Sequence, residues 1–431
     1  MTIRHKGILI ILDGLGDRPV EAFSGRTPLE AAETVHLDRI AASGQCGLMD
    51  PLGPGIPVDT ATGTGMLLGA SPGSVMGLAR GPVEAAGVGL EIAPGDLALR
   101  CNFATLERRD GRLAVIDRRA GRIRSGTAEL ASALADVDLG NGITATLAPA
   151  TQHRAVLRLS GPGLSAEIGD TDPGVVPLPS PVLRSKARQR EDVRASRSAA
   201  AVNRFVDEAH ARLSAHPLNR ERIESGRPAA NGIITRGAGL AGTGRSVIER
   251  LGLTGIVVAG ESTVLGLASL FGMRSFTDPR FTGLPDTDVE AKVATALEAL
   301  ETADVVFLHL KGADICSHDF DPEGKRNFLE RVDGALAPFI GRDVVIGVTG
   351  DHSSDCGTGG HSGDPVPALL TAPRGRRDEI DRFGETACVS GGLGRLTANS
   401  YVMVFLDQMG AVPEWRAGTV TFPSGPDGWV G

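Results

Sequence analysis

Gly7–Leu12 (GILIIL) is an unbroken apolar run, and the carboxylate of Asp13 follows it directly. Two similar runs occur toward the carboxyl end of the chain, Val305–Leu310 (VVFLHL) and Val344–Thr349 (VVIGVT). Short β-branched runs without polar alternation are typical of strands buried on both faces, as in a parallel sheet. A fourth run, Gly255–Ala259 (GIVVA), fits the same sheet. The sequence therefore predicts an α/β fold with a mostly parallel sheet.

Segments with a helical spacing of apolar residues separate these runs, as the crossover connections of a parallel sheet require. They are Leu29–Ser43, Ala199–Ala215, Glu290–Glu301 and Asn327–Ile340. The sequence pattern changes between about residues 93 and 245. Arg clusters and a Pro-rich stretch occur there, and no predicted strand ends in a carboxylate pair. We therefore predict a host domain formed by residues 1–92 and 246–431, with residues 93–245 inserted into it.

Composition narrows the class of protein. The formal net charge of −8 over 431 residues argues against nucleic acid as the main partner, although a small anionic substrate stays compatible with it. Five cysteines without a CxxC pair indicate a reducing, cytoplasmic chain. The apolar run before Asp13 is too short for a membrane span, so we expect no membrane partner. The sequence does not decide the oligomeric state, and a homo-oligomer is compatible with it.

Side chains that bind metals cluster where the predicted strands end. Because the carboxyl ends of parallel strands meet at one edge of a sheet, these side chains are expected to converge there. Asp and His suit Zn or Mn, and six such ligands are too many for one tetrahedral ion. Two ions can hold the attacking and the leaving oxygen of an in-line phosphoryl displacement. The six residues are Asp13, Asp314, His318, Asp351, His352 and His361. His309, inside an apolar run, is expected to be structural.

A hydroxyl-rich loop, residues 58–65, precedes the apolar stretch Met66–Leu68 and is expected to lead into a helix. The N-terminus of a helix offers free backbone N–H groups and a positive dipole end to a phosphate. A hydroxyl there, deprotonated by a bound metal, would be an activated nucleophile. From the residues alone, Thr60 and Thr62 are both candidates, and Asp59 is a candidate N-cap of the helix.

Beyond these residues, the chain resembles the alkaline phosphatase superfamily, and within it the archaeal-type cofactor-independent phosphoglycerate mutases, over nearly its whole length. Ten stretches carry the resemblance: residues 11–19, 27–32, 46–51, 80–82, 100–105, 117–123, 170–173, 236–239, 361–367 and 391–395. The resemblance implies an alkaline-phosphatase-like α/β domain with an inserted α+β substrate domain. It also implies two divalent ions (Mn, Zn or Mg) and no organic cofactor.

The resemblance also distributes roles among residues. It implies one ion held by Asp13, the nucleophile, Asp351 and His352, and another held by Asp314, His318 and His361. It implies a substrate held by Arg119, His153, Arg154, Asp172, Arg236 and Lys311. The nucleophile in the family pattern is the Ser of Ser-Asp-Thr-Ala-His, before Leu-Leu-Gly. Counting back from residues 67–69 without a gap places Thr60 on that Ser, whereas a two-residue gap would place Val58 there.

Two departures from the pattern accompany Thr60, because Ala61 replaces the acidic residue and Thr64 replaces the His. We therefore consider two functions. The first is the interconversion of 2- and 3-phosphoglycerate through a phospho-threonine intermediate. The alternative is a phosphatase or phosphotransferase that acts on another small phosphorylated or phosphonate metabolite in a specialised biosynthetic pathway. A non-enzymatic, metabolite-binding role is disfavoured, because all six metal-binding residues are present.

Overall fold

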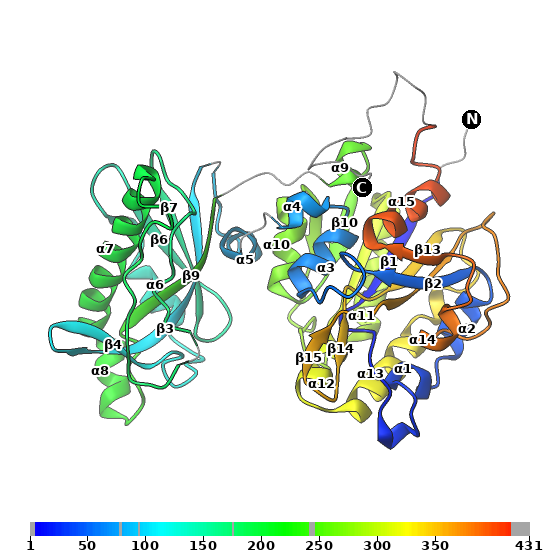
Figure 1. Cartoon of the computed structure of the whole chain (residues 1–431), viewed down its shortest axis with the longest axis horizontal. Coiled ribbons are helices and arrows are strands. Elements are labelled where there is room, and N and C mark those ends of the chain that lie inside the picture. The colour runs from blue at the N-terminus through cyan, green and yellow to red at the C-terminus, as the bar shows by residue number, and fades with distance from the viewer. Residues whose placement is uncertain (1–4, 77–79, 94, 175, 241–245, 415–431) are drawn as a thin grey trace. The chain divides into compact units, whose positions relative to one another are not determined.

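The computed structural model describes residues 5–76, 80–93, 95–174, 176–240 and 246–414. The chain forms two compact units, Met1–Gly77 with Gly244–Gly431, and Leu78–Thr243 (Figure 1). The second unit starts earlier than the predicted residue 93, because α5 (Arg80–Gly87) packs against β3 (Leu97–Arg109) and β9 (Gly232–Leu240). In the described parts of the chain, no helix is long and apolar enough to cross a membrane.

The first unit is built on one eight-stranded sheet. Its strand order is β11 (Arg274–Phe276), β10 (Gly255–Val258), β12 (Val305–Leu310), β1 (Gly7–Leu12), β13 (Val345–Thr349), β16 (Val366–Thr371), β2 (Gln45–Asp50) and β17 (Gly394–Thr397). Both neighbours of β16 run antiparallel to it, and the other pairs are parallel. The four predicted strands are consecutive neighbours in this sheet, so the predicted α/β fold is confirmed.

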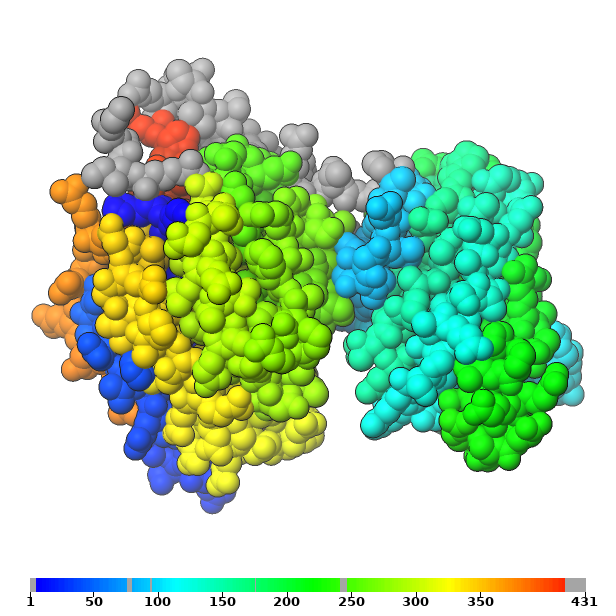
Figure 2. All heavy atoms as spheres, turned by 180° about the vertical axis from the view of Figure 1, so that it is seen from behind, coloured from blue at the N-terminus to red at the C-terminus, as the bar shows by residue number. Residues whose placement is uncertain are grey.

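Helices cover the sheet in two groups, as the complete burial of β1 requires. One group contains α3 (Thr60–Leu67), α4 (Pro72–Met76), α9 (Val247–Arg250), α10 (Ser262–Leu270) and α15 (Ala398–Gln408), and the other α1 (Pro28–Ala31), α2 (Val35–Ala41), α11 (Val289–Thr302), α12 (Gly312–His318) and α13 (Pro322–Ala335). In Figure 2, the yellow surface of α13 lies beside the blue residues of α1 and α2, which it contacts. Short elements complete the unit: η1 (Glu21–Phe23), η2 (Ala337–Phe339), β14 (Ser353–Asp355), β15 (Gly360–Ser362) and α14 (Glu385–Cys388).

The single helix predicted over residues 29–43 is wrong, because the chain forms α1 and α2 with an extended residue, Ala32, between them. The carboxylate of Asp333 accepts hydrogen bonds from the backbone N–H groups of His36 (3.0 Å) and Leu37 (2.7 Å). These are N–H groups that a helix start leaves without an intrahelical partner, so Asp333 on α13 caps the start of α2. A side chain almost 300 residues away in sequence thus decides where α2 begins.

The second unit is an antiparallel sheet with helices. The strand order is β5 (Val137–Asp138), β6 (Thr144–Pro149), β7 (Arg154–Ser160), β3, β4 (Arg112–Asp117) and β8 (Ser180–Pro181), with β9 also paired to β3. Its helices besides α5 are α6 (Thr127–Ser132), α7 (Val193–Ala215) and α8 (Pro217–Glu224). Alternate residues of β3, such as Leu99 and Phe103, join a core with α7. Ala98 packs instead with Ala85 of α5, so Arg100 lies on the α5 face.

Candidate metal centre

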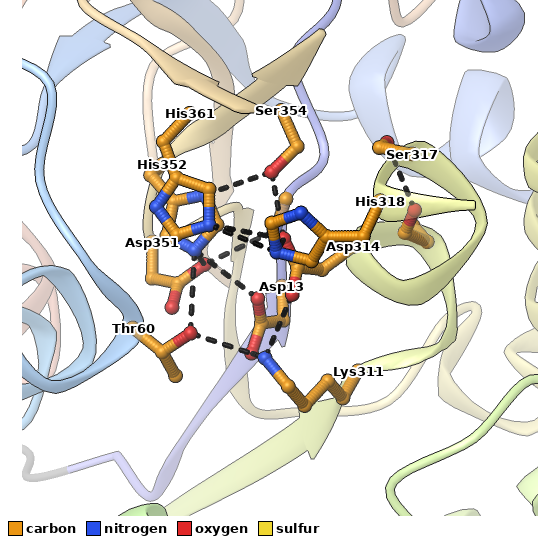
Figure 3. A network of polar contacts seen from close by, with 12 residues as sticks. Asp13, Thr60, Lys311, Asp314, Ser317, His318, Asp351, His352, Ser354 and His361 are labelled. Atoms are coloured by element: carbon orange, nitrogen blue, oxygen red, sulfur yellow. Dashed lines mark hydrogen bonds and ion pairs between the residues drawn. The ribbon is translucent and has the colours of Figure 1, made fainter. Parts of the chain in front are cut away.

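The six predicted metal-binding residues converge at the carboxyl edge of the parallel strands (Figure 3). Asp13 follows β1, and the parallel register of β1 with β12 and β13 brings the ends of all three strands together. Asp351 and His352 follow β13, and Asp314 and His318 lie on α12. The hairpin of β14 and β15 carries the remaining ligand, and α3 begins at the same edge. The sheet topology therefore builds one site from segments scattered along the chain.

Asp314, His318 and His361 form the first group. Asp314 Oδ1 lies 3.4 Å from the Nε2 atoms of both histidines. The Nδ1 of His318 is 2.7 Å from the carbonyl oxygen of Gly359, and the Nδ1 of His361 is 2.7 Å from that of Val58. Because a carbonyl only accepts, each Nδ1 carries a hydrogen, and Nε2 is the nitrogen of each ring that is left to bind a cation in the neutral form. This orientation is the one that metal-binding histidines take.

The second group surrounds Asp13, which is fully buried. The Nε2 of His352 lies 3.3 Å from Asp13 Oδ1 and 3.7 Å from Asp351 Oδ1. His309, which the sequence suggested to be structural, places Nε2 3.1 Å from Asp13 Oδ2. Apart from this contact with Asp13, neither ring nitrogen of His309 has a partner among the described residues, although the side chain is buried. His309 is therefore a further candidate ligand, which its position one residue before the end of β12 could have suggested.

The donor atoms of the site fit divalent ions. Ligand atoms of Asp314, His352 and His361 lie within 4.8 Å of one another, and so do those of Asp13, His309 and Asp351. His352, whose Nε2 also lies 3.3 Å from Asp13 Oδ1, is thus within reach of both groups, and we assign it with Asp13. Apart from the 3.3 Å approach of His352 Nε2, the buried Asp13 Oδ1 has no hydrogen-bond partner in the described part of the chain. A buried carboxylate oxygen without a partner is costly, and a cation would satisfy it. Carboxylate and imidazole donors suit Zn or Mn.

Charges in the site shift the pKa values of its members. Burial by itself would raise the pKa of Asp13 and of Asp314, but Lys311 and neighbouring histidines outweigh it and lower both. Burial and the charge of Asp13 raise the pKa of Asp351. Burial would lower the pKa of Lys311, yet the carboxylates around it raise it above its ordinary value. At neutral pH, Lys311 is therefore an ammonium ion between the carboxylates of Asp13 and Asp314, 2.9 Å from each.

The hydroxyl of Thr60 faces this site. Thr60 is the first residue of α3, and its Oγ1 lies 3.1 Å from Lys311 Nζ and 3.4 Å from His352 Nε2. Thr62, the other candidate, donates its hydroxyl hydrogen to Asp59 Oδ1 at 2.8 Å, and the same oxygen caps α3 by accepting from the Thr62 N–H at 3.0 Å. The geometry thus favours Thr60 over Thr62 as the nucleophile.

Two further residues of α3 fix its distance from the metal-binding residues. A Cβ atom on Gly63 would lie 2.0 Å from the backbone oxygen of Asp351, so only glycine permits this approach. The next residue, Thr64, donates a 2.9 Å hydrogen bond from its hydroxyl to Asp351 Oδ2. The other oxygen of Asp351 accepts from the Gly14 N–H at 3.2 Å. Asp351 is therefore oriented by α3 and by the turn after β1.

Most of the predicted substrate residues belong to the second unit, and three of them, His153, Arg154 and Arg236, lie near Arg100. Arg100 pairs across the sheet with Arg236 and lies beside Glu84 of α5, at 3.0 Å. Arg154, Arg236 and Arg80 are close enough to lower the pKa of Arg100, which burial, the largest cause, brings to about 10. Arg100 and Glu84 were not predicted, because neither the pairing of β3 with β9 nor the packing of α5 on β3 can be recognised from the local sequence.

His153, Arg119 and Asp172 complete the predicted set. Burial, then Arg154 and Arg119, lower the pKa of His153 to about 4, so His153 is neutral at pH 7. Asp172 instead binds the guanidinium of Arg118 through both oxygens, at 2.9 and 2.6 Å. The structure therefore brings His153, Arg119 and Arg154 into one cationic cluster with Arg100 and Arg236, whereas Asp172 holds Arg118. Lys311, the remaining member of the set, lies at the metal centre.

The sheet gathers carboxylates and imidazoles at its carboxyl edge, with a hydroxyl at the start of a helix beside them, and this set of groups suits a metal-dependent phosphoryl-transfer enzyme. Comparison with known proteins narrows this class. Residues 41–219 match the family described as 2,3-bisphosphoglycerate-independent phosphoglycerate mutase. The chain is 41% identical to 2,3-bisphosphoglycerate-independent phosphoglycerate mutase 1 from Methanothermobacter thermautotrophicus. The match covers 94% of this chain and 98% of that protein. The chain belongs to the 2,3-bisphosphoglycerate-independent phosphoglycerate mutase family.

Other relatives and solved structures support membership of the same family. The mutase of the same name from Methanopyrus kandleri is 40% identical over 96% of this chain and 99% of its own length. Among solved structures, the PH0037 protein from Pyrococcus horikoshii superposes with a TM-score of 0.81 at 32% identity, covering 96% of this chain and all of that one. The cofactor-independent phosphoglycerate mutase from Thermoplasma acidophilum gives 0.71 at 33% identity, covering 94% of this chain and all of its own. The predicted family is confirmed.

Proposed function

We propose that the protein interconverts 2-phosphoglycerate and 3-phosphoglycerate by metal-dependent phosphoryl transfer through Thr60. One observation carries the proposal: the Thr60 hydroxyl, at the start of α3, lies 3.1 Å from Lys311 Nζ within the cluster of metal-binding residues. The family supports the substrate, because relatives with this activity in their names align along almost the whole chain. Nothing in the site or among the relatives favours the alternative substrates.

In this proposal two divalent ions (Mn, Zn or Mg) complete the site, without an organic cofactor. Asp13, Thr60, Asp351 and His352 would hold one ion, and Asp314, His318 and His361 would hold the other. His309 is an additional donor beside Asp13. When bound, the ions would lower the pKa of the Thr60 hydroxyl and offset charge on the transferring phosphoryl group.

The reaction then consists of two transfers at one oxygen. Thr60 Oγ1 attacks the phosphorus of 3-phosphoglycerate, and the bond from phosphorus to the C3 oxygen breaks. The proton that the Thr60 hydroxyl loses goes to the C3 oxygen, which leaves as a hydroxyl, and Thr60 carries the phosphoryl group. The C2 hydroxyl of the same glycerate then attacks that phosphorus, the bond from phosphorus to Thr60 Oγ1 breaks, and the C2 proton goes to Thr60 Oγ1, which restores the free hydroxyl. Water is not consumed, and the ammonium of Lys311 offsets negative charge at Thr60 in both steps.

We further propose that the second unit is the substrate-binding domain. A phosphoglycerate carries a carboxylate besides its phosphoryl group, and planar guanidinium groups bind carboxylates through two hydrogen bonds. Arg119, Arg154 and Arg236 supply such groups, together with Arg100, and neutral His153 supplies a ring nitrogen, Nδ1, that has no hydrogen-bond partner among the described residues. Asp172 supports the cluster indirectly by holding Arg118. A cytoplasmic location, as the buried free cysteines suggest, belongs to the same proposal.

The test is incubation of the purified, Mn-loaded protein with 3-phosphoglycerate, followed by phosphorus NMR. Formation of 2-phosphoglycerate without inorganic phosphate is expected, and Thr62→Ala should behave like the unaltered protein because its hydroxyl is bound to Asp59. Inorganic phosphate as the sole product would mean that water intercepts the phospho-enzyme, and the protein would be a phosphatase. An unchanged spectrum would exclude 3-phosphoglycerate as the substrate.

A further inference from the structure

The hydroxyl of Ser354 lies between the two groups of metal-binding residues (Figure 3). Its Oγ is 2.7 Å from Oδ1 of Asp314, which belongs to one group, and 3.1 Å from Nδ1 of His352, which belongs to the proposed set for the other ion. Ser354 is fully buried on β14, directly beyond the ligand pair that follows β13. One side chain, which is itself outside both proposed ligand sets, therefore contacts ligands of both ions.

The direction of these two hydrogen bonds follows from the chemistry of the groups. Asp314 is ion-paired with Lys311 at 2.9 Å and is a carboxylate, which only accepts hydrogen bonds. The hydroxyl hydrogen of Ser354 must therefore point at Asp314, and its oxygen must accept from the Nδ1–H of His352. That leaves Nε2 of His352 as the nitrogen that can bind a cation, and it is Nε2 that faces Asp13 and Thr60, at 3.3 and 3.4 Å.

The strand that carries Ser354 is held rigidly by a buried lysine. Lys325 is fully buried on α13, and its Nζ donates to the backbone oxygens of Ser354 (2.9 Å) and Gly16 (3.2 Å) and to Asp17 Oδ2 (2.9 Å). The Ser354 N–H also donates to the Gly16 oxygen at 2.9 Å. Asp17 in turn accepts from the Cys356 N–H at 3.1 Å. The position of the Ser354 hydroxyl is thus fixed relative to the turn after β1.

We propose that Ser354 is a positioning residue shared by the two ion sites. Its single hydroxyl sets the Nδ1–H tautomer of His352 and the orientation of the Asp314 carboxylate. Loss of this hydroxyl therefore lowers the affinity of the protein for both ions. This inference rests on the proposed two-ion function. Outer partners that orient a metal ligand are worth 10- to 100-fold in metal affinity, and here one partner acts on two ligands.

The neighbouring residue provides a matched control. Ser353 is also fully buried on β14, but its Oγ has no hydrogen-bond partner among the described residues. Ser354→Ala and Ser353→Ala thus remove the same atom, one position apart, from equally buried sites. Both intact variants and the unaltered chain would be stripped of metal and titrated with Mn²⁺, with bound and free ion counted separately. Thermal unfolding of the metal-free forms would check that both variants are folded.

We expect Ser354→Ala to raise the dissociation constants of both ions by about 10-fold or more, and Ser353→Ala to leave them unchanged. Three results would overturn the shared role of Ser354. They are a lower affinity for only one of the two ions, an equally lowered affinity in both variants, and unchanged ion binding in Ser354→Ala. Such results would leave the proposed function intact if the unaltered chain binds two ions. Binding of fewer than two ions by the unaltered chain would instead refute the two-ion function, and the shared role with it.

Discussion

Replacement of Glu84 by Gln tests how the cationic cluster of the second unit is kept stable. Glu84 Oε1 lies 3.0 Å from Nε of Arg100, and the two side chains are only 11% and 10% exposed. Arg236, Arg154 and Arg80 add positive charge around Arg100. In Glu84→Gln the guanidinium groups lose the carboxylate that offsets them, while the shape of the side chain is retained.

The size of the effect follows from the burial of the pair. Breaking a buried ion pair by removing one partner costs about 3–5 kcal/mol, because the remaining charge stays desolvated. We expect about 3 kcal/mol for Glu84→Gln, since the amide oxygen of Gln can still accept from Arg100. With a urea dependence of about 2 kcal/mol per molar, the unfolding midpoint should fall by about 1.5 M.

The assay is urea unfolding of the intact chain at pH 7, followed by far-ultraviolet circular dichroism. Glu107→Gln is the matched control, because Glu107 and Arg109 also lie 3.0 Å apart but are both 53% exposed, and an exposed pair contributes about 0.2–1 kcal/mol. Saturating 3-phosphoglycerate should raise the midpoint of Glu84→Gln more than that of the unaltered protein, because the anion restores the missing negative charge. A midpoint for Glu84→Gln equal to that of Glu107→Gln would refute the reasoning.

Three further predictions concern single side chains. Thr60→Ala should lower turnover of 3-phosphoglycerate by at least about 10³-fold with metal still bound, whereas activity retained by Thr60→Ala and lost in Thr62→Ala would move the nucleophile to Thr62. His361→Ala and Asp351→Ala should each lower the metal content measured by elemental analysis, and unchanged stoichiometry would contradict their assignment as ligands. The pKa of His153 is lowered to about 4 from an ordinary 6.5, so between these values the unfolded chain binds a proton that the folded protein does not. Stability should therefore fall as the pH drops through this range, and His153→Gln should flatten this dependence in urea unfolding; an identical slope in the variant would argue against a buried, neutral His153.

The four central strands β10, β12, β1 and β13 were predictable because each is an apolar run that needs no partner to be recognised, unlike the exposed edge strand β11. The run Gly7–Leu12, for instance, is buried at every position and is followed by Asp13, as expected for a strand between two neighbours. The edge rule for parallel sheets then placed the ligands together without any knowledge of distance. The break between α1 and α2 was not predictable, because Asp333, which caps α2, comes from a distant helix.

The same limit explains which site residues the sequence could not supply. Glu84 and Arg100 meet only because α5 packs on the face of β3 from which Arg100 projects. His309 looked structural because five apolar residues surround it within β12, and only the register with β1 places it beside Asp13. Ser353 and Ser354 are indistinguishable in the sequence, because they are adjacent residues of the same type. Alternation along a strand separates them, since neighbouring side chains point to opposite faces.

The departures of the nucleophile loop from the family pattern are compatible with phosphoryl transfer through Thr60, because the local geometry keeps what that chemistry needs. The position of the family His is taken by Thr64, whose hydroxyl donates to Asp351 at 2.9 Å. Gly63 permits that contact by letting α3 approach the Asp351 backbone. Since Thr60 begins the same helix, the hydrogen bond from Thr64 also sets the distance of the Thr60 hydroxyl from Lys311. The loop thus holds a hydroxyl against the predicted metal-binding residues by packing α3 closely, and Thr60 offers the same kind of oxygen, a hydroxyl, as the serine of the family pattern.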